Sequence, residues 1–351
     1  MNAIEVRIYD PDLELQGIID EFSSLIWIRR YQEPGEFELH TPYSEESRQL
    51  LVTGNIVHKF DGKVAKEAGV IESLQMNKDE IVIKGRFWEL YMEFHTMTGT
   101  YASRDWGPVE TLLRHVMTFE FAAIPLLALG EDHGLTEAID FQATNKTLLN
   151  TASKLCRATA LGFRIWPDFE AKKMFFEVYK GVDRSSASAS KVIFSETYDN
   201  LTNESYTLNI TNYRNAARIV QIDDNGTLLM AYYGDGDTGI NARLMPVMSS
   251  VETNGRTAEQ INEAMRLVGE TALVNRQIAE TFTFATDPEG TFKYREDYDL
   301  GDLVIINHNA WNIHQTRRIT EVEEDYEGGK VTIIPTCGDP LPESVNFEEG
   351  Y

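Results

Sequence analysis

The stretch Tyr298-Asp-Leu-Gly-Asp-Leu-Val-Ile-Ile306 says most about the fold of this chain. Asp299 and Gly301 are typical of a tight turn, because glycine adopts positive φ without steric cost. The run that follows, 303–306, is apolar and β-branched, as in a buried strand. Residues 317–322, Arg-Arg-Ile-Thr-Glu-Val, alternate like a half-buried return strand. The pattern predicts a β-hairpin or adjacent strand pair, in which Asp299 and Asp302 form turns rather than act as catalytic acids.

The composition is that of a folded protein. A chain of 351 residues is expected to hold about two to three domains. Its hydrophobic fraction of 42% and aromatic fraction of 11% are too high for a disordered chain. The longest apolar stretch, Phe119–Gly130, is short and is interrupted by Pro125, so no membrane span is predicted. The first residues lack the basic start and apolar core of a secretory signal, and we expect synthesis in a cytoplasm.

The net charge and the two cysteines further limit which class of protein this chain can be. A net charge of −24 argues against a nucleic-acid-binding surface, which needs clustered Lys and Arg to neutralise phosphates. Acidic walls would keep DNA from sticking if several copies lined a channel, and solubility alone explains the charge equally well. Cys156 and Cys337 lie far apart in the chain, and separate buried thiols are the expected state.

The first hundred residues have the alternation and turn signals of a β meander. Turns are predicted at Glu33–Gly35, Asp61–Gly62 and Asn77–Asp79. The predicted strands are Val6–Tyr9, Gly17–Asp20, Leu25–Tyr31, Gly35–His40, Asn55–Phe60, Gly69–Leu74 and Glu80–Lys84.

Residues 100–182 change to a mixed helical and strand pattern. Pro108 suits the first position of a helix whose apolar face comprises Val109, Leu112, Leu113 and Val116. A second helix is predicted to begin at a cap formed by Asn145 or Thr144 and to end at Gly162. Two strands, Phe163–Trp166 and Met174–Tyr179, follow on either side of a Pro167–Asp168 turn. These elements predict a small α/β layer.

The remainder is predicted as strands around one long amphipathic helix. Strands are expected within 191–222, at 228–233 and within 282–334. Thr257 and Gln260 form a capping box at the helix start. The apolar stripe that must pack on another element comprises Ile261, Met265, Val268, Ala272 and Ile278 or Ala279.

We find no motif for a catalytic, cofactor or metal site. The seven histidines are scattered and only His308 and His314 are near neighbours, without the spacing of a zinc site. The acidic loops Asp223–Gly226 and Asp235–Gly239 contain calcium-type ligands but not the spacing of an EF-hand, and turns between strands explain them. Nucleophile-elbow and phosphate-loop motifs are missing as well. We therefore predict no enzyme, no cofactor and no metal.

One enzyme class stays open at this point. A glycosidase needs only two carboxylates about 5–10 Å apart, and 56 acidic residues make chance pairs unavoidable. Tryptophans can stack on sugars, but most here fall within strand or helix patterns and are predicted as core. The tryptophans are Trp27, Trp88, Trp106, Trp166 and Trp311, of which only Trp311 is expected to be exposed.

Several segments, in the same order, resemble siphophage tail hub proteins, the baseplate hub family that includes the N-terminal hub region of tail-associated lysins. The first is Trp27-x-Arg-Arg-Tyr-x-x-Pro-Gly-Glu-Phe-Glu-Leu39. The others are Gly69–Ile71 with Ile81–Phe87, Phe176–Ser185 with Val192–Ser195, Tyr213–Ala217, and Tyr298–Ile306. The resemblance extends from about Val6 to Pro340. Many relatives continue into a large lysin, and because this chain stops at Tyr351 a fused hydrolase is not expected.

The resemblance implies a β-rich α+β fold of phage tail hub architecture, with two barrel-like β regions framing a small α/β layer. We expect an N-terminal barrel-like domain at 1–98, an α/β domain at 99–182, a β segment completing the barrels at 183–255, and a helix with a C-terminal β domain at 256–351. Discontinuous domains are expected.

The implied role is a structural subunit of a phage or prophage tail tip, made in the host cytoplasm. It would form a ring, commonly a homotrimer, contacting a distal tail protein, the end of the tape measure protein, and a receptor-binding or spike protein. No specific nucleic acid binding is expected. Two alternatives remain at this stage: a cell-wall glycan hydrolase or carbohydrate-binding tail protein, and the hub of a contractile injection device.

Overall fold

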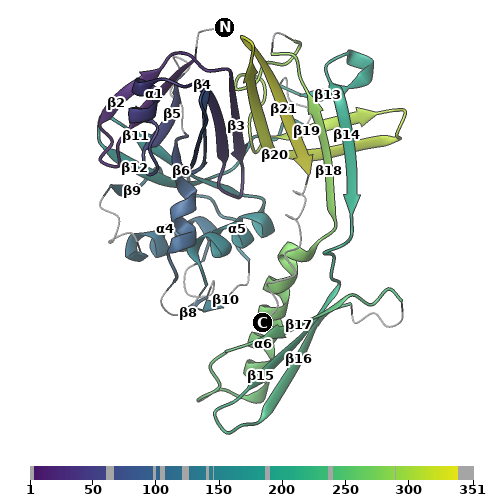
Figure 1. Ribbon diagram of the computed structural model, residues 1–351. Helices are drawn as coiled ribbons and strands as arrows, with labels where there is room; N and C mark the ends of the chain where they lie inside the picture. The colour runs from purple at the N-terminus through teal and green to yellow at the C-terminus, as the bar shows by residue number, and fades with distance from the viewer. Residues whose placement is uncertain are drawn as a thin grey trace.

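A 13-stranded sheet built from both ends of the chain dominates the fold (Figure 1). The computed structural model describes residues 4–60, 67–97, 100–102, 107–120, 126–139, 142–144, 146–185, 190–235, 240–288 and 290–338. The N-terminal strands are β1 (Glu5–Tyr9), β2 (Leu15–Ile19), β3 (Ser24–Arg30), β4 (Glu36–Pro42), β5 (Ile56–Phe60), β6 (Gly69–Met76) and β7 (Glu80–Phe87). The C-terminal strands are β13 (Ile193–Ser195), β14 (Thr202–Asn209), β18 (Ala279–Ala285), β19 (Leu303–His308), β20 (Ile313–Glu327) and β21 (Lys330–Gly338).

The predicted N-terminal strands and two of their turns are confirmed, but the meander is not: among the described residues the strands do not pair in chain order, because β4 pairs with β7 and β1 with β5. β3 and β4 pair antiparallel on either side of the Glu33–Gly35 turn. Between β6 and β7, the Asn77 side chain accepts the backbone N–H groups of Asp79 and Glu80. The third predicted turn, at Asp61–Gly62, lies outside the described residues. Three short helices complete this part: α1 (Glu45–Leu50), η1 (Trp88–Leu90) and α2 (Tyr91–Phe94).

The two barrel-like regions expected from the sequence are not closed barrels. Instead, β3 pairs antiparallel with β20, with Arg30 opposite Glu321, so that the N-terminal and C-terminal strands continue one another in a single sheet. In a closed barrel, the edge strands of one region would pair with each other. Here the edge strands β3 and β20 pair across the two regions instead. In the described part of the chain, the sheet path ends at β14 on one side and at β2 on the other.

The predicted strand pair near the C-terminus is confirmed. β19 and β20 are antiparallel, with Leu303 opposite Arg318. Gly301 has φ of 91°, and the backbone N–H of Asp302 donates to the carbonyl of Asp299 at 3.1 Å. The chain then reverses at residues 309–312. β20 is long enough to leave β19 and continue as the neighbour of β3 and β21.

Residues 107–179 form the predicted helices and strands. α4 (Val109–Glu120) buries the four predicted apolar residues, and α5 (Leu148–Thr159) packs in the same core. A three-stranded sheet accompanies them, in the order β11 (Gly162–Asp168), β12 (Lys173–Tyr179) and β9 (Leu127–Leu129), with β9 parallel to β12. A second, two-stranded sheet pairs β8 (Thr100–Ala102) with β10 (Gln142–Thr144).

The predicted ends of α5 were wrong. The helix is capped by Thr147, whose hydroxyl accepts the N–H of Asn150, while Thr144 belongs to β10 and Asn145 lies outside the described residues. It ends at Ala160, which takes the left-handed conformation. Gly162 instead opens β11, where a Cβ would lie 2.3 Å from the Tyr31 ring. Pro167 is inside β11, so the turn falls at residues 169–172.

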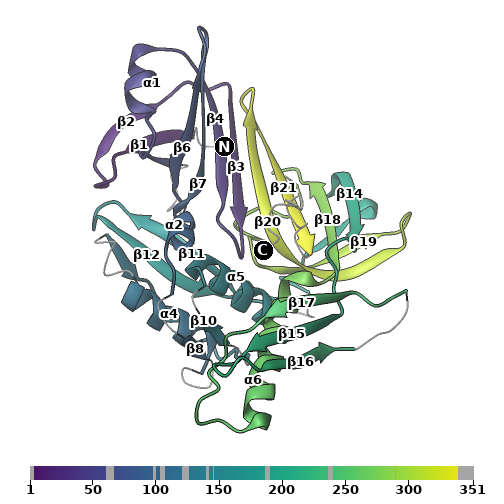
Figure 2. The same cartoon turned by 60° about the horizontal axis from the view of Figure 1, so that its bottom comes forward.

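Residues 210–278 project from the sheets as an arm (Figures 1 and 2). Its three-stranded sheet has the order β16 (Leu228–Gly234), β15 (Ala216–Ile222), β17 (Leu244–Met248), and α6 (Ala258–Leu273) packs on one face. The predicted capping box is present. Because α6 ends at Leu273 and is followed by η4 (Val274–Arg276), Ile278 and Ala279 are not part of its stripe.

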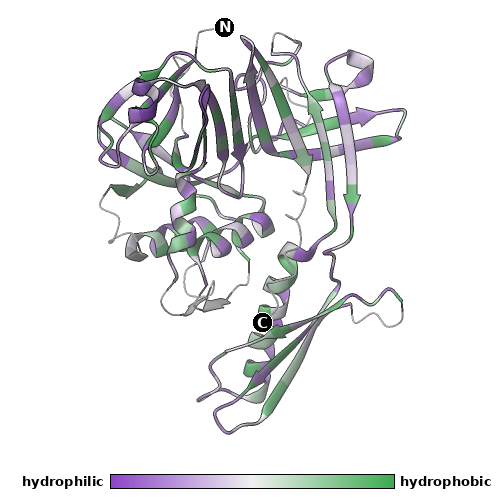
Figure 3. Ribbon diagram, viewed as in Figure 1, coloured by the Kyte–Doolittle hydropathy of each residue, from purple (hydrophilic) through white to green (hydrophobic). Residues whose placement is uncertain are grey.

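Hydrophobic residues alternate with hydrophilic ones along many strands (Figure 3), as half-buried sheets require. Cys156 and Cys337 are both buried and free, which confirms the expected separate thiols. Burial raises the pKa of both thiols. Among the described residues, no helix has the length and apolar character needed to cross a membrane.

Candidate functional site

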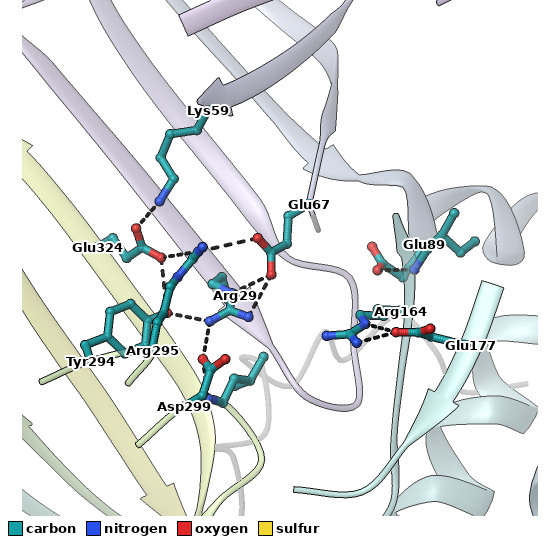
Figure 4. Close-up of polar contacts among 12 residues, drawn as sticks. Arg29, Lys59, Glu67, Glu89, Arg164, Glu177, Tyr294, Arg295, Asp299 and Glu324 are labelled. Atoms are coloured by element: carbon teal, nitrogen blue, oxygen red, sulfur yellow. Dashed lines mark hydrogen bonds and ion pairs between the residues drawn. The ribbon is translucent and has the colours of Figure 1, made fainter. Parts of the chain in front are cut away.

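A buried cluster of charges lies where the N-terminal and C-terminal strands meet (Figure 4). β3 contributes Arg29, β5 contributes Lys59, and Glu67 precedes β6. The C-terminal half contributes Glu324 from β20, and Tyr294, Arg295 and Asp299 from the segment before β19. The cluster therefore connects segments from opposite ends of the chain.

Arg29 is the centre of one half of this cluster. Its guanidinium donates to Glu67 Oε1 at 2.7 Å and to Asp299 Oδ1 at 2.5 Å. It also donates to the Tyr294 hydroxyl at 2.6 Å. These three partners leave Arg29 fully paired although it is only 4% exposed, as a buried guanidinium requires.

Glu324 is the centre of the other half. It forms ion pairs with Lys59 and with Arg295, the latter at 2.9 Å. The hydroxyls of Tyr294 and Tyr326 donate to it at 3.1 Å and 2.6 Å. Arg295 also approaches Glu67 at 3.4 Å, which links the two halves into one network.

The network balances three cations against three carboxylates and favours the ionised forms of Glu67 and Glu324. Burial alone would raise the pKa of Glu67, but attraction to Arg29 and Arg295 outweighs it and lowers the pKa to about 2. The pKa of Glu324 is lowered in the same way, by Lys59 and Arg295 against the effect of burial. Because its charged groups are paired with one another, although Arg295 Nε has no hydrogen-bond partner among the described residues, the cluster is suited to joining strands rather than to proton transfer.

Glu89 is another buried carboxyl, beside the α/β layer (Figure 4). Its Oε1 accepts the N–H of Ile165 at 2.7 Å, whereas Oε2 has no hydrogen-bond partner among the described residues. Burial raises the pKa of Glu89 to about 7, against the backbone hydrogen bond from Ile165. The neighbouring pair of Arg164 with Glu177 is by contrast a closed ion pair.

We expect Glu89→Gln to remove part of the pH dependence of stability. Between about pH 4.5 and 7 the folded protein keeps a proton on Glu89 that the unfolded chain has lost. The contribution of protonated Glu89 to the free energy of unfolding is therefore complete below this pH window. As pH rises through the window, the free energy of unfolding falls by roughly 3 kcal/mol. Urea unfolding at several pH values measures how the free energy of unfolding changes with pH.

Glu93→Gln is the matched control, because Glu93 forms an exposed pair with Arg86. It should keep the wild-type pH slope, while Glu89→Gln flattens it. Equal slopes in the wild type and Glu89→Gln would show that Glu89 is ionised in the folded protein.

A groove of about 1190 Å³ lies between the base of the arm and the strands of the large sheet. Its lining combines Arg30, Arg157 and Arg214 with several glutamates. Arg30 is paired with Glu36 and Glu321, and Arg157 is paired with Glu33. Over the whole lining, four arginines stand against six glutamates and one aspartate, so the groove has a net negative charge and does not favour an anion.

The residues weighed in the sequence do not gather into one site. His308 and His314 occupy adjacent register positions of the β19–β20 hairpin, so their side chains point to opposite faces. Asp223 accepts the N–H groups of Asn225 and Thr227 and forms a turn between β15 and β16. The second acidic loop lies largely outside the described residues, at 236–239.

The tryptophans and turn aspartates are placed as follows. Trp27 and Trp88 are buried and Trp311 is exposed, as predicted, whereas Trp166 on β11 is only partly buried; Trp106 lies outside the described residues. Trp311 stacks on His308. Asp302 does more than form a turn, because it accepts the Val182 N–H at 2.7 Å and binds Arg184 at 3.1 Å. Asp299 likewise belongs to the buried cluster.

Sequence reasoning missed the buried cluster. A usable signal was present in β20, where Glu324 is in phase with the buried Val322. A carboxylate at an inward position of a strand requires a buried cation, and Lys59, near the end of the short strand β5, was a candidate.

The chain matches the family described as Siphovirus ReqiPepy6 Gp37-like protein over residues 5–339. No curated protein matches its sequence.

Several solved structures share the fold over nearly the full length. The tail protein from Neisseria meningitidis MC58 is 14% identical with a TM-score of 0.56, covering 96% of this chain and 97% of that chain. The 43 kDa tail protein of prophage MuSo2 from Shewanella oneidensis is 11% identical, with a TM-score of 0.57 and coverage of 96% and 98%. Prophage tail protein gp18 from Listeria monocytogenes EGD-e is 13% identical, with a TM-score of 0.50 and coverage of 96% and 94%.

At these identities the likeness establishes the fold. Together with the family match, it confirms the resemblance to siphophage tail proteins noted in the sequence. The matched residues extend over nearly the whole chain, and the chain belongs to the family of Siphovirus ReqiPepy6 Gp37-like proteins.

Proposed function

We propose that this protein is a structural subunit of a phage or prophage tail tip. It forms the ring-shaped baseplate hub that joins the tail tube to receptor-binding or spike components. The observation that carries the proposal is the coincidence of a siphovirus family match over residues 5–339 with a fold shared, end to end, with solved tail proteins. Its place of action is the tail of the virion.

The partners belong to the same proposal. The hub is a homo-oligomer, most simply a trimer, and contacts a distal tail protein, the end of the tape measure protein, and a receptor-binding or spike protein. Among the described residues the large sheet ends at β14 and β2, which supports assembly, because unpaired strand edges are hazards that a symmetric neighbour can cover. The net charge of −24 suits a subunit whose ring lets DNA pass without binding it.

We also propose an N-terminal β domain at 1–98, an α/β domain at 99–182, a β segment at 183–255, and a helix with a C-terminal β domain at 256–351. The pairing of β14 with β18 supports domains that are discontinuous in sequence.

Electron microscopy of intact particles tests the function. We expect density for this chain around the tail axis at the tip, between the tube and the distal appendages. Density away from the axis, or absence of the chain from purified particles, would refute the proposal. Release of reducing ends from cell wall by the purified protein would favour the glycan hydrolase instead.

A further inference from the structure

The arm has one covered and one bare sheet face. α6 packs on the face formed by residues such as Ala217, Ile219 and Ala231. The opposite face carries large apolar side chains that are between 46% and 74% exposed. We call this surface the arm face; it comprises Ile222, Leu228, Met230, Tyr232, Leu244 and Met248.

Strand register makes the arm face continuous. On β15, Val220 lies opposite Met230 of β16 and Met248 of β17, so these three side chains form one row across the sheet. The next row places Arg218 between Tyr232 and Pro246.

The arm face is unusual for such an acidic chain. Its described outward positions on β15, β16 and β17 include one cation, Arg218, and no carboxylate. A continuous apolar surface of this kind marks an interaction site. A surface with one cation favours a partner that is apolar and carries a carboxylate.

A second exposed apolar surface lies on β14. This strand pairs only with β18 in the described part of the chain, so its other edge is open. We call the surface around it the edge surface; it comprises Tyr206, Leu208, Ile210 and Trp311. Tyr206 and Trp311 both lie beside Phe282. Glu204, on the same strand, supplies a partly exposed carboxylate next to His308.

We propose that the arm face of one copy docks on the edge surface of the next copy in the ring. A cyclic ring with more than two members needs two different surfaces that complement each other, and this chain presents two separate apolar surfaces. Their charges also match, because Arg218 belongs to one and Glu204 to the other. The docking would cover the open edge of β14. This inference rests on the proposed hub function and names the contact that closes the hub.

Sedimentation equilibrium of the full chain over a concentration series tests the contact. Met230→Lys in the arm face and Leu208→Lys in the edge surface should each raise the dissociation constant for self-association about tenfold or more. Met76→Lys is the matched control, an exposed strand methionine outside both surfaces, and should associate as the wild type does. Circular dichroism checks that the variants stay folded, which we expect because all three side chains are exposed.

The inference is overturned if the wild-type chain stays monomeric at every concentration reached. It is also overturned if Met230→Lys or Leu208→Lys associates normally, or if Met76→Lys weakens association as much as they do. None of these outcomes touches the tail location, which the microscopy of particles decides. The two proposals can therefore fail separately.

Discussion

Replacing Glu324 by Gln is expected to lower the free energy of unfolding by about 3–5 kcal/mol, since it removes one partner from a buried ion pair. Lys59 is only 1% exposed and would lose its anionic partner, keeping only neutral acceptors: the Tyr326 hydroxyl at 3.1 Å and the oxygen of the introduced amide. Arg295 would keep its longer contact with Glu67. Urea unfolding at neutral pH, followed by fluorescence of the buried tryptophans, measures the loss.

The pH dependence of this variant gives a second readout. Burial already lowers the pKa of Lys59 in the wild type, and Glu324 opposes the shift. Without Glu324 the pKa should fall further, so the folded protein would release a proton that the unfolded chain keeps. The variant should therefore regain stability as pH rises toward the ordinary pKa of lysine, about 10.4.

Two controls isolate the buried charge. Glu321→Gln, on the same strand, breaks a partly exposed pair with Arg30 and should cost less than about 1 kcal/mol. Adding Lys59→Met to Glu324→Gln removes the unpaired cation and should recover part of the loss. If Glu324→Gln were as mild as Glu321→Gln, the cluster would contribute nothing specific to the joining of the strands.

Local signals in the sequence were enough to predict many of the elements. The Asn77 turn, the capping box at Thr257 and the strand pair after Gly301 each depend on residues close together in the chain. Their energies come from side-chain hydrogen bonds and glycine conformation, which do not depend on distant partners. Such features could be predicted with their residues.

The joining of the two halves could not be predicted in the same way. Arg30 and Glu321 are 291 positions apart. No local preference indicates that β3 pairs with β20 rather than with another N-terminal strand. The same limit explains the error at Gly162, whose glycine is required by the distant Tyr31 ring rather than by the end of α5. The buried cluster depends on this pairing and was missed with it.

Substitution of Gly301 by Ala should be comparably destabilising, by about 2–6 kcal/mol. Positive φ at a non-glycine residue costs about 1–3 kcal/mol, and Gly301 has φ of 91°. In addition, a Cβ would lie 2.4 Å from the Tyr31 ring, and overpacking of this kind costs about 1–3 kcal/mol.

The Tyr31 ring has little freedom to move away. Tyr31 is fully buried. Its hydroxyl donates to the carbonyl oxygens of Ala160 and Tyr179, at 3.2 Å and 3.3 Å, and accepts the N–H of Gly181 at 3.1 Å. A shift of the ring would break contacts to the α/β layer, so the strain at Gly301 would be felt in both the large sheet and that layer.

Gly328→Ala is the matched control for this substitution. Gly328 also has positive φ, 58°, but a Cβ there would meet no atom within 4 Å. It should therefore show the backbone cost alone, about 1 kcal/mol. Thermal and urea unfolding of both variants separates the two contributions. Equal losses would mean that the Tyr31 ring yields to a methyl group, and that Gly301 is required only by the turn that begins the last strand pair.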